Sequence, residues 1–142
     1  MSACTFFGHS TCPENIREKL RESIVDLIET KGVVFFYVGN QGEFDRMVCS
    51  LLQELKSKYS IDYVIVLAYL PEKRSAALRQ DFSDTLFPEG IEKIPKCYAI
   101  AWRNRWMLQR SDYVITYIRH SWGGAAQFAE LAQRQKKTVL AL

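Results

Sequence analysis

The stretch Ser121-Trp122-Gly123-Gly124-Ala125-Ala126-Gln127-Phe128-Ala129-Glu130 joins an apolar segment, residues 113–118, to a segment of helical character, residues 125–135. Two adjacent glycines at such a strand-to-helix turn let the backbone approach a ligand closely, because neither residue carries a Cβ atom. The free N–H groups and the positive end of the following helix favour an anion such as phosphate. The plainer alternative is an ordinary loop that needs a positive φ, followed by a solvated Glu130.

The rest of the chain alternates apolar and helical segments. Strands are expected where the residues are continuously apolar, at residues 3–7, 33–38, 63–68, 113–118 and 138–142. Helices are expected where apolar residues repeat at helical spacing, at residues 16–31, 44–55, 98–109 and 125–135. This alternation predicts an α/β fold, a single Rossmann-like doubly wound domain over residues 1–142. Its mainly parallel five-stranded sheet takes the order 3-2-1-4-5.

One segment, residues 69–97, interrupts the alternation. It contains Pro71, Pro88 and Pro95, with charged and aromatic residues between them. A short helix over residues 74–80 is compatible with its sequence. Long irregular connections in compact domains are often functional lids, and the sequence leaves the role of this insertion open.

Composition limits the classes of function. The 142 residues are 48% hydrophobic and 25% charged, as in one globular domain. The net charge of +3 is small and evenly spread, so no nucleic-acid partner is expected. No apolar run approaches the roughly 20 residues of a membrane span, and the first residues lack the form of a signal peptide. The four cysteines show no metal-binding spacing, so we expect a cytoplasmic protein with no metal and no cofactor.

The predicted strand order places the ligand site. In doubly wound sheets, ligands bind outside the carboxyl ends of the strands at the point where the strand order reverses. Here that point lies between the first and fourth expected strands, at the turns of residues 8–10 and 120–124. The turn of residues 39–42 is next to them. Both histidines of the chain, His9 and His120, fall in the two facing turns.

These turns suit a nucleotide or a ribose phosphate. They offer backbone N–H groups and hydroxyls, and the ring of Trp122 offers a stacking surface. The helix that precedes the fourth expected strand adds Arg103 and Arg105, and an arginine beside an anion site is a natural clamp for phosphate. The sequence lacks GxGxxG, GxxxxGK[ST] and GxSxG, which argues against a dinucleotide dehydrogenase, a phosphate-loop ATPase and a Ser-His-acid hydrolase.

Four short runs carry a resemblance to a known family: Arg103-Asn104-Arg105-Trp106-Met107, Ser111-Asp112-Tyr113-Val114-Ile115, Gly123-Gly124, and Glu130. They resemble the motif of the SLOG superfamily, which includes the Lonely-Guy nucleotide phosphoribohydrolases and the Smf/DprA proteins. Arg103 stands nine residues before Asp112 and Glu130 seven after Gly123, as in the Lonely-Guy pattern. Residues 39–45 resemble the second glycine-rich turn of the superfamily. The most similar subgroup is that of the short SLOG proteins related to YpsA.

The resemblance implies a function and a set of site residues. In the family chemistry, Glu130 would assist cleavage of the base–ribose bond of a nucleotide, and Arg103 would orient the nucleotide, so both are the predicted catalytic residues. The predicted ligand-binding residues are Gly8, His9, Ser10, Gly39, Asn40, Gln41, Gly42, Asp45, Arg105, His120, Ser121, Trp122, Gly123, Gly124, Ala125 and Gln127. The resemblance also implies a homodimer.

The chain departs from the Lonely-Guy pattern in the turn itself. Trp122 stands where that pattern has proline, and Ala126-Gln127 replaces a glycine and a threonine that help to hold phosphate. The insertion of residues 69–97 is not part of the pattern either. Two functions from different classes therefore stay open. One is a nucleotide N-glycosidase of the phosphoribohydrolase type, and the other is a non-catalytic sensor or sequestering protein for a nucleotide or an ADP-ribose-like signal.

Overall fold

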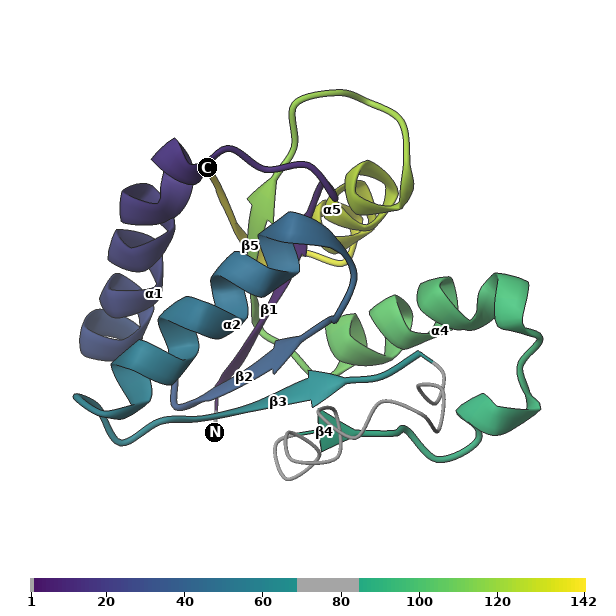
Figure 1. Cartoon of the computed structure of the whole chain (residues 1–142), viewed down its shortest axis with the longest axis horizontal. Coiled ribbons are helices and arrows are strands. Elements are labelled where there is room, and N and C mark those ends of the chain that lie inside the picture. Colours follow the sequence, from purple (N-terminus) through teal and green to yellow (C-terminus); the bar gives the residue numbers. More distant parts are fainter. Residues whose placement is uncertain (1, 69–84) are drawn as a thin grey trace.

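The computed structural model describes residues 2–68 and 85–142 and contains one parallel sheet (Figure 1). Its strands are β1 (Ala3–Gly8), β2 (Phe35–Val38), β3 (Asp62–Val66), β4 (Thr85–Leu86), β5 (Tyr113–Tyr117) and β6 (Thr138–Ala141). They lie in the order β4-β3-β2-β1-β5-β6, and each neighbouring pair is parallel. The order reverses direction at β1, whose neighbours are β2 and β5.

Helices cover both faces of this sheet (Figure 1). They are η1 (Glu14–Ile16), α1 (Arg17–Lys31), α2 (Gly42–Lys56), η3 (Ile91–Lys93), α4 (Lys96–Gln109) and α5 (Gly124–Arg134). The alternation of side chains along β1 separates two cores, because successive residues of a strand point to opposite faces. Phe6 packs in the core formed with α1 and α2, whereas Phe7 packs with α4 and α5.

The predicted fold class is confirmed. The five expected strands take the expected order, since 3-2-1-4-5 corresponds to β3-β2-β1-β5-β6. The sequence missed β4, which pairs with the end of β3 at the edge of the sheet. Two residues are too few to show a periodic pattern, and they lie inside the irregular segment of residues 69–97, between Pro71 and Pro88. The helix predicted for residues 74–80 lies outside the described residues.

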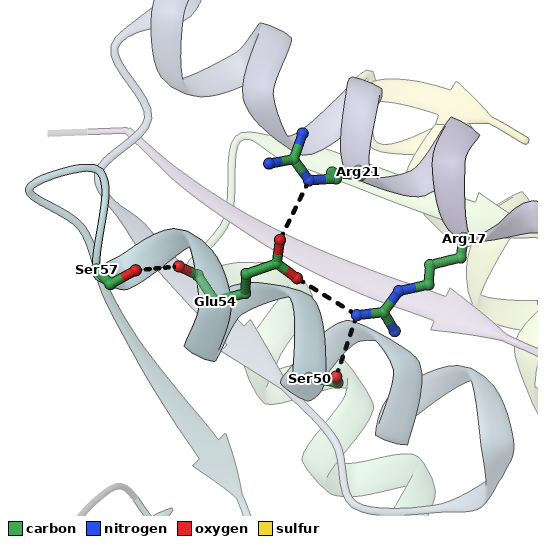
Figure 2. Close-up of polar contacts among 5 residues, drawn as sticks. All are labelled: Arg17, Arg21, Ser50, Glu54 and Ser57. Atoms are coloured by element: carbon green, nitrogen blue, oxygen red, sulfur yellow. Dashed lines mark hydrogen bonds and ion pairs between the residues drawn. The ribbon is translucent and has the colours of Figure 1, made fainter.

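The outer surfaces of α1 and α2 are joined by ion pairs (Figure 2). The Glu54 carboxylate pairs with Arg17 Nη2 at 3.5 Å and with Arg21 Nε at 3.6 Å. Arg17 Nη2 also donates to Ser50 Oγ at 3.3 Å. The Glu54 side chain is 45% exposed, so we expect each pair to contribute less than about 1 kcal/mol. The two helices are held chiefly by the apolar residues that they bury, such as Leu20, Ile24 and Leu51.

Among residues 2–68 and 85–142, none of the helices combines the length and the apolar character that crossing a bilayer requires.

Candidate functional site

A cavity of about 440 Å³ lies at the carboxyl ends of the central strands, where the turns after β1, β2 and β5 meet. It is lined by Phe6, Phe7, Gly8, His9, Ser10, Thr11, Gly39, Gln41, Asp45, Ile100, Arg103, Asn104, Met107, Tyr117, Arg119, His120, Gly123, Gly124 and Ala125. The cavity therefore lies where the ligand site was expected, at the ends of β1 and β5.

Close packing of two turns shapes one wall of the cavity. A Cβ atom at Gly8 would lie 2.3 Å from the ring of Phe44, and one at Gly42 would lie 2.6 Å from Ser10 Cα. Gly42 also has a φ of +90°, a conformation that glycine adopts without strain. The Glu43 N–H donates to the Ser10 carbonyl at 2.7 Å. At both positions the packing leaves no room for a side chain, so Gly8 and Gly42 let the turn after β1 pack against the start of α2.

The N-terminus of α5 is different, because its glycines face open space. A Cβ atom at Gly124 would meet no heavy atom within 4 Å, and one at Gly123 would meet only His120, at 3.9 Å. Gly123, with a φ of +96°, is the N-cap residue, and as a glycine it makes no side-chain capping hydrogen bond. The first N–H groups of a helix lack partners within the helix and attract anions. The cavity is thus open at the N-terminus of α5.

The opposite wall contains a buried arginine. Arg103, only 2% exposed, donates from Nε to Asn104 Oδ1 at 3.0 Å and from Nη1 to Asn40 Oδ1 at 3.2 Å and the Val66 carbonyl at 3.1 Å. A Cβ atom at Gly39 would lie 3.1 Å from its guanidinium carbon. Arg103 therefore links α4 to the ends of β2 and β3, and it brings a positive charge to the cavity.

Asp45 faces the same region and is 8% exposed. Its Oδ2 accepts the Gln41 N–H at 2.9 Å, which caps the start of α2. Burial raises the pKa of Asp45 from 3.8 to about 6, against the opposing effects of that hydrogen bond and of the Arg103 charge. Among the described residues that line the cavity, Asp45 is the one carboxylate.

A series of aromatic rings in contact, stacked except for the edge-to-face pair of Tyr117 and His9, runs from the core to the surface beside the cavity. Phe44 lies 6.1 Å from Tyr117, Tyr117 lies 6.0 Å from His9, His9 lies 3.7 Å from His120, and His120 lies 3.9 Å from Trp122, as distances between ring centroids. We call these five residues the aromatic ladder. His9 Nε2 accepts the Arg119 backbone N–H at 2.8 Å. Burial, and then the charges of His120 and Arg119, lower the pKa of His9, so its neutral form is favoured.

The structure brings most of the predicted site residues to the cavity. Those that line it are Gly8, His9, Ser10, Gly39, Gln41, Asp45, Arg103, His120, Gly123, Gly124 and Ala125. Among them Arg103 has a role that the sequence did not predict, because its guanidinium braces three elements of the fold.

Seven predicted residues do not line the cavity: Asn40, Gly42, Arg105, Ser121, Trp122, Gln127 and Glu130. Glu130, the predicted catalytic carboxylate, lies on the outer side of α5, where its side chain is 64% exposed and pairs with Arg134 one turn later. Arg105 is exposed and lies over the ring of Phe128 at 5.9 Å. Glu130 points away from the sheet because the buried face of α5 is formed by Phe128, Ala129 and Ala132. Its catalytic role stays a prediction.

The sequence analysis missed eight lining residues: Phe6, Phe7, Thr11, Ile100, Asn104, Met107, Tyr117 and Arg119. Arg119 could have been found, since it directly precedes His120 at the end of the fourth expected strand. Tyr117, Phe6 and Phe7 were assigned only to strands. An apolar pattern indicates that a residue is buried, but it does not show that the residue lies beside a cavity. Among the described residues, no group of three His, Cys, Asp or Glu side chains is placed to hold a metal ion.

The fold and this cavity define a doubly wound, Rossmann-like α/β domain with glycine-rich turns around an electropositive site. No protein-family model matches the sequence, and no curated protein matches it. The structure is similar to that of DNA processing protein A (DprA) from Streptococcus pneumoniae, with a TM-score of 0.69 and 14% identity over 99% of this chain and 50% of that one. It is also similar to DprA from Helicobacter pylori, with a TM-score of 0.68 and 13% identity over 99% of this chain and 64% of that one.

The chain therefore has a DprA-like fold. Membership of the SLOG superfamily stays a prediction from the sequence motif. It spans half of the first DprA chain and less than two thirds of the second. At these identities the likeness shows the fold alone, so the YpsA-related subgroup, the homodimer and the cytoplasmic location stay predictions.

The expectation that nucleic acid is not a partner is corrected by these comparisons. The H. pylori protein is described as having a single-stranded DNA binding mode. The exclusion was drawn from the small net charge of the whole chain, but net charge does not show how charges are distributed around one cavity. The small net charge of this chain therefore does not exclude a nucleic-acid ligand.

Proposed function

We propose that the cavity binds the phosphate of a nucleotide, either free or as a unit of single-stranded DNA. The observation that carries this proposal is the open N-terminus of α5 at Gly124, which faces the cavity with no side chain or backbone atom within 4 Å of an added Cβ. Phosphate groups bind at such helix ends because the unpaired N–H groups and the helix dipole both favour negative charge.

The charges around the cavity support an anionic ligand. Arg103 and Arg119 line it together with His9 and His120, against the single carboxylate of Asp45 among the described lining residues. Because the pKa of Asp45 is raised to about 6, part of its charge is lost in mildly acidic solution. A phosphate would therefore meet an excess of positive charge and of N–H donors.

The choice between a free nucleotide and a DNA strand depends on the fold comparison. The similarity to DprA covers 99% of this chain, so the whole domain has a counterpart in a protein described as binding single-stranded DNA. The cavity itself favours the phosphate group that both ligands share. Calorimetry with a nucleoside monophosphate and with a short oligothymidylate would distinguish them.

We expect Gly124→Asp to weaken binding of oligothymidylate at least tenfold, or about 1.4 kcal/mol, with the fold intact. The new carboxylate would occupy the open space at the helix end and repel the phosphate. Isothermal titration calorimetry measures the affinity, and circular dichroism checks the fold.

The matched control is Ala126→Asp, which adds the same charge to the first turns of α5 at a residue that does not line the cavity. We expect a much smaller loss of affinity in this variant. Equal losses in the two variants would indicate a general effect of charge, and an unchanged affinity in folded Gly124→Asp protein would contradict the proposed phosphate position.

No described residue that lines the cavity supports an N-glycosidase function in the same way. Its predicted carboxylate, Glu130, is exposed, pairs with Arg134 and does not line the cavity. We expect Glu130→Gln to change the affinity for nucleoside monophosphates less than twofold, and we expect neither the wild type nor this variant to release free base. Chromatography of the nucleotide after incubation measures base release. Release by the wild type that is lost in Glu130→Gln would contradict this prediction and restore the hydrolase.

A further inference from the structure

We propose that Trp122 is a stacking platform for the base of the nucleotide whose phosphate lies at the N-terminus of α5. The inference rests on the proposed phosphate site and assigns the recognition of the base to a residue outside the cavity. The ligand class is then a nucleotide unit with an accessible base, in a free nucleotide or in a single-stranded nucleic acid.

The aromatic ladder supports this assignment. It begins at Phe44, which is fully buried, and at Tyr117, which is 6% exposed, and it ends at Trp122, which is 69% exposed. The rings of His9, His120 and Trp122 are nearly parallel, with interplanar angles of 17° and 18°. One face of Trp122 is covered by His120, and no ring of the described residues is recorded on its other face. A flat aromatic ring is what would continue the series.

The exposure of Trp122 is unusual for the residue. Tryptophan is among the side chains that gain most from burial, and both other tryptophans of the chain, Trp102 and Trp106, are partly buried. An exposed indole that is held in place by a second ring is pre-ordered, so a base loses little additional side-chain entropy on stacking against it.

The platform is also within reach of the phosphate site. Trp122 directly precedes Gly123, and consecutive Cα atoms lie about 3.8 Å apart. A phosphate at the helix N-terminus and a base on the indole would therefore lie against adjacent residues of the chain. Because the platform lies outside the cavity, the next nucleotides of a strand would not be excluded.

Base stacking can be tested separately from phosphate binding, by comparing oligomers that carry bases with oligomers that lack them. The probes are a short oligothymidylate, an abasic oligomer of the same length and charge, and thymidine monophosphate. We expect the wild type to bind oligothymidylate roughly tenfold more tightly than the abasic oligomer, since base stacking on aromatic side chains is typically of that size. Trp122→Ala should lose this preference and keep its affinity for the abasic oligomer, while Trp122→Phe should retain most of the preference.

Tyr98→Ala is the matched control, because Tyr98 is 65% exposed and lies away from the cavity lining. It should bind all three probes as the wild type does. A proportional loss of thymidine monophosphate binding in Trp122→Ala would show that the platform also takes a free nucleotide, whereas a loss confined to the oligomer would assign it to the strand.

Two results would overturn the inference in distinguishable ways. If the wild type binds thymidylate and abasic oligomers equally while Gly124→Asp weakens both, the platform is wrong and the phosphate site stands. If the wild type binds none of the probes, the phosphate site and the platform are both wrong.

Discussion

Arg103→Ala is expected to lower the free energy of unfolding by about 3–5 kcal/mol, the cost of removing one partner from a buried charged network. The side chain is 2% exposed and its hydrogen bonds join Asn104, Asn40 and the Val66 carbonyl. Truncation would leave two buried acceptors, Asn104 Oδ1 and the Val66 carbonyl, without their donor. It would also leave Asp45 without the nearby positive charge. Urea denaturation followed by circular dichroism measures the change.

The control is Arg105→Ala on the same helix. Arg105 is exposed and carries the same charge, so we expect a loss below about 1 kcal/mol. A second variant, Arg103→Ala with Asp45→Asn, should recover part of the lost stability, because it removes the uncompensated carboxylate. Equal stabilities of Arg103→Ala and Arg105→Ala would show that the Arg103 network does not hold the fold.

The same network determines what Arg103 can do for a ligand. Its Nε and Nη1 groups already donate to protein acceptors, so it acts first as a positioning residue for the turn after β2. Its charge nevertheless lines the cavity and favours an anion there. Loss of phosphate binding in Arg103→Ala would therefore combine a lost charge with a displaced turn.

Asp45 is expected to make the protein less stable as the pH rises from about 4 to 6. Its folded pKa of about 6 lies above its ordinary value of 3.8, so the folded state binds the proton more tightly than the unfolded chain. The stabilisation by this group is complete below pH 3.8 and is lost as the pH rises through 6. The difference corresponds to about 3 kcal/mol.

This contribution is isolated by comparing the wild type with Asp45→Asn. The free energy of unfolding of the wild type, minus that of the variant, should fall by about 3 kcal/mol between pH 3 and pH 7. His9 acts in the opposite direction, since its lowered pKa makes the folded state more stable as the pH rises toward 6.5, but it is present in both proteins. A difference that rises with pH would mean that attraction to Arg103 outweighs the burial of Asp45.

Much of the fold could be predicted from local patterns. Continuous apolar runs identified β1, β2, β3, β5 and β6, and the glycine-bearing turns identified the edge of the sheet at which the cavity lies. These features follow from short-range sequence because burial on both faces of a parallel strand requires an unbroken apolar run. β4 escaped detection because pairing with the end of β3, and not its own pattern, makes its two residues a strand.

The candidate site was predicted less completely, and Glu130 shows why. Its spacing after Gly123 matches the family motif, but spacing along a helix does not determine how the helix is rotated against the sheet. That rotation is set by the packing of Phe128 on Phe7, whose ring centroids are 5.5 Å apart, and by the burial of Ala129 and Ala132. With those residues inward, Glu130 points outward, since each residue advances about 100° around the axis.

The sequence by itself determined the strands, the edge at which the turns meet and the glycine pair that opens α5, because each depends on local patterns. The order of the strands followed from the right-handed crossovers that the alternation of strands and helices requires. Only the tertiary structure decided that Arg103 is buried, that Asp45 and not Glu130 faces the cavity, and that His9, His120 and Trp122 stack. These contacts join residues from separate elements, and their geometry depends on how the helices pack on the sheet. Local patterns record which residues are apolar, whereas the packing decides which polar groups meet.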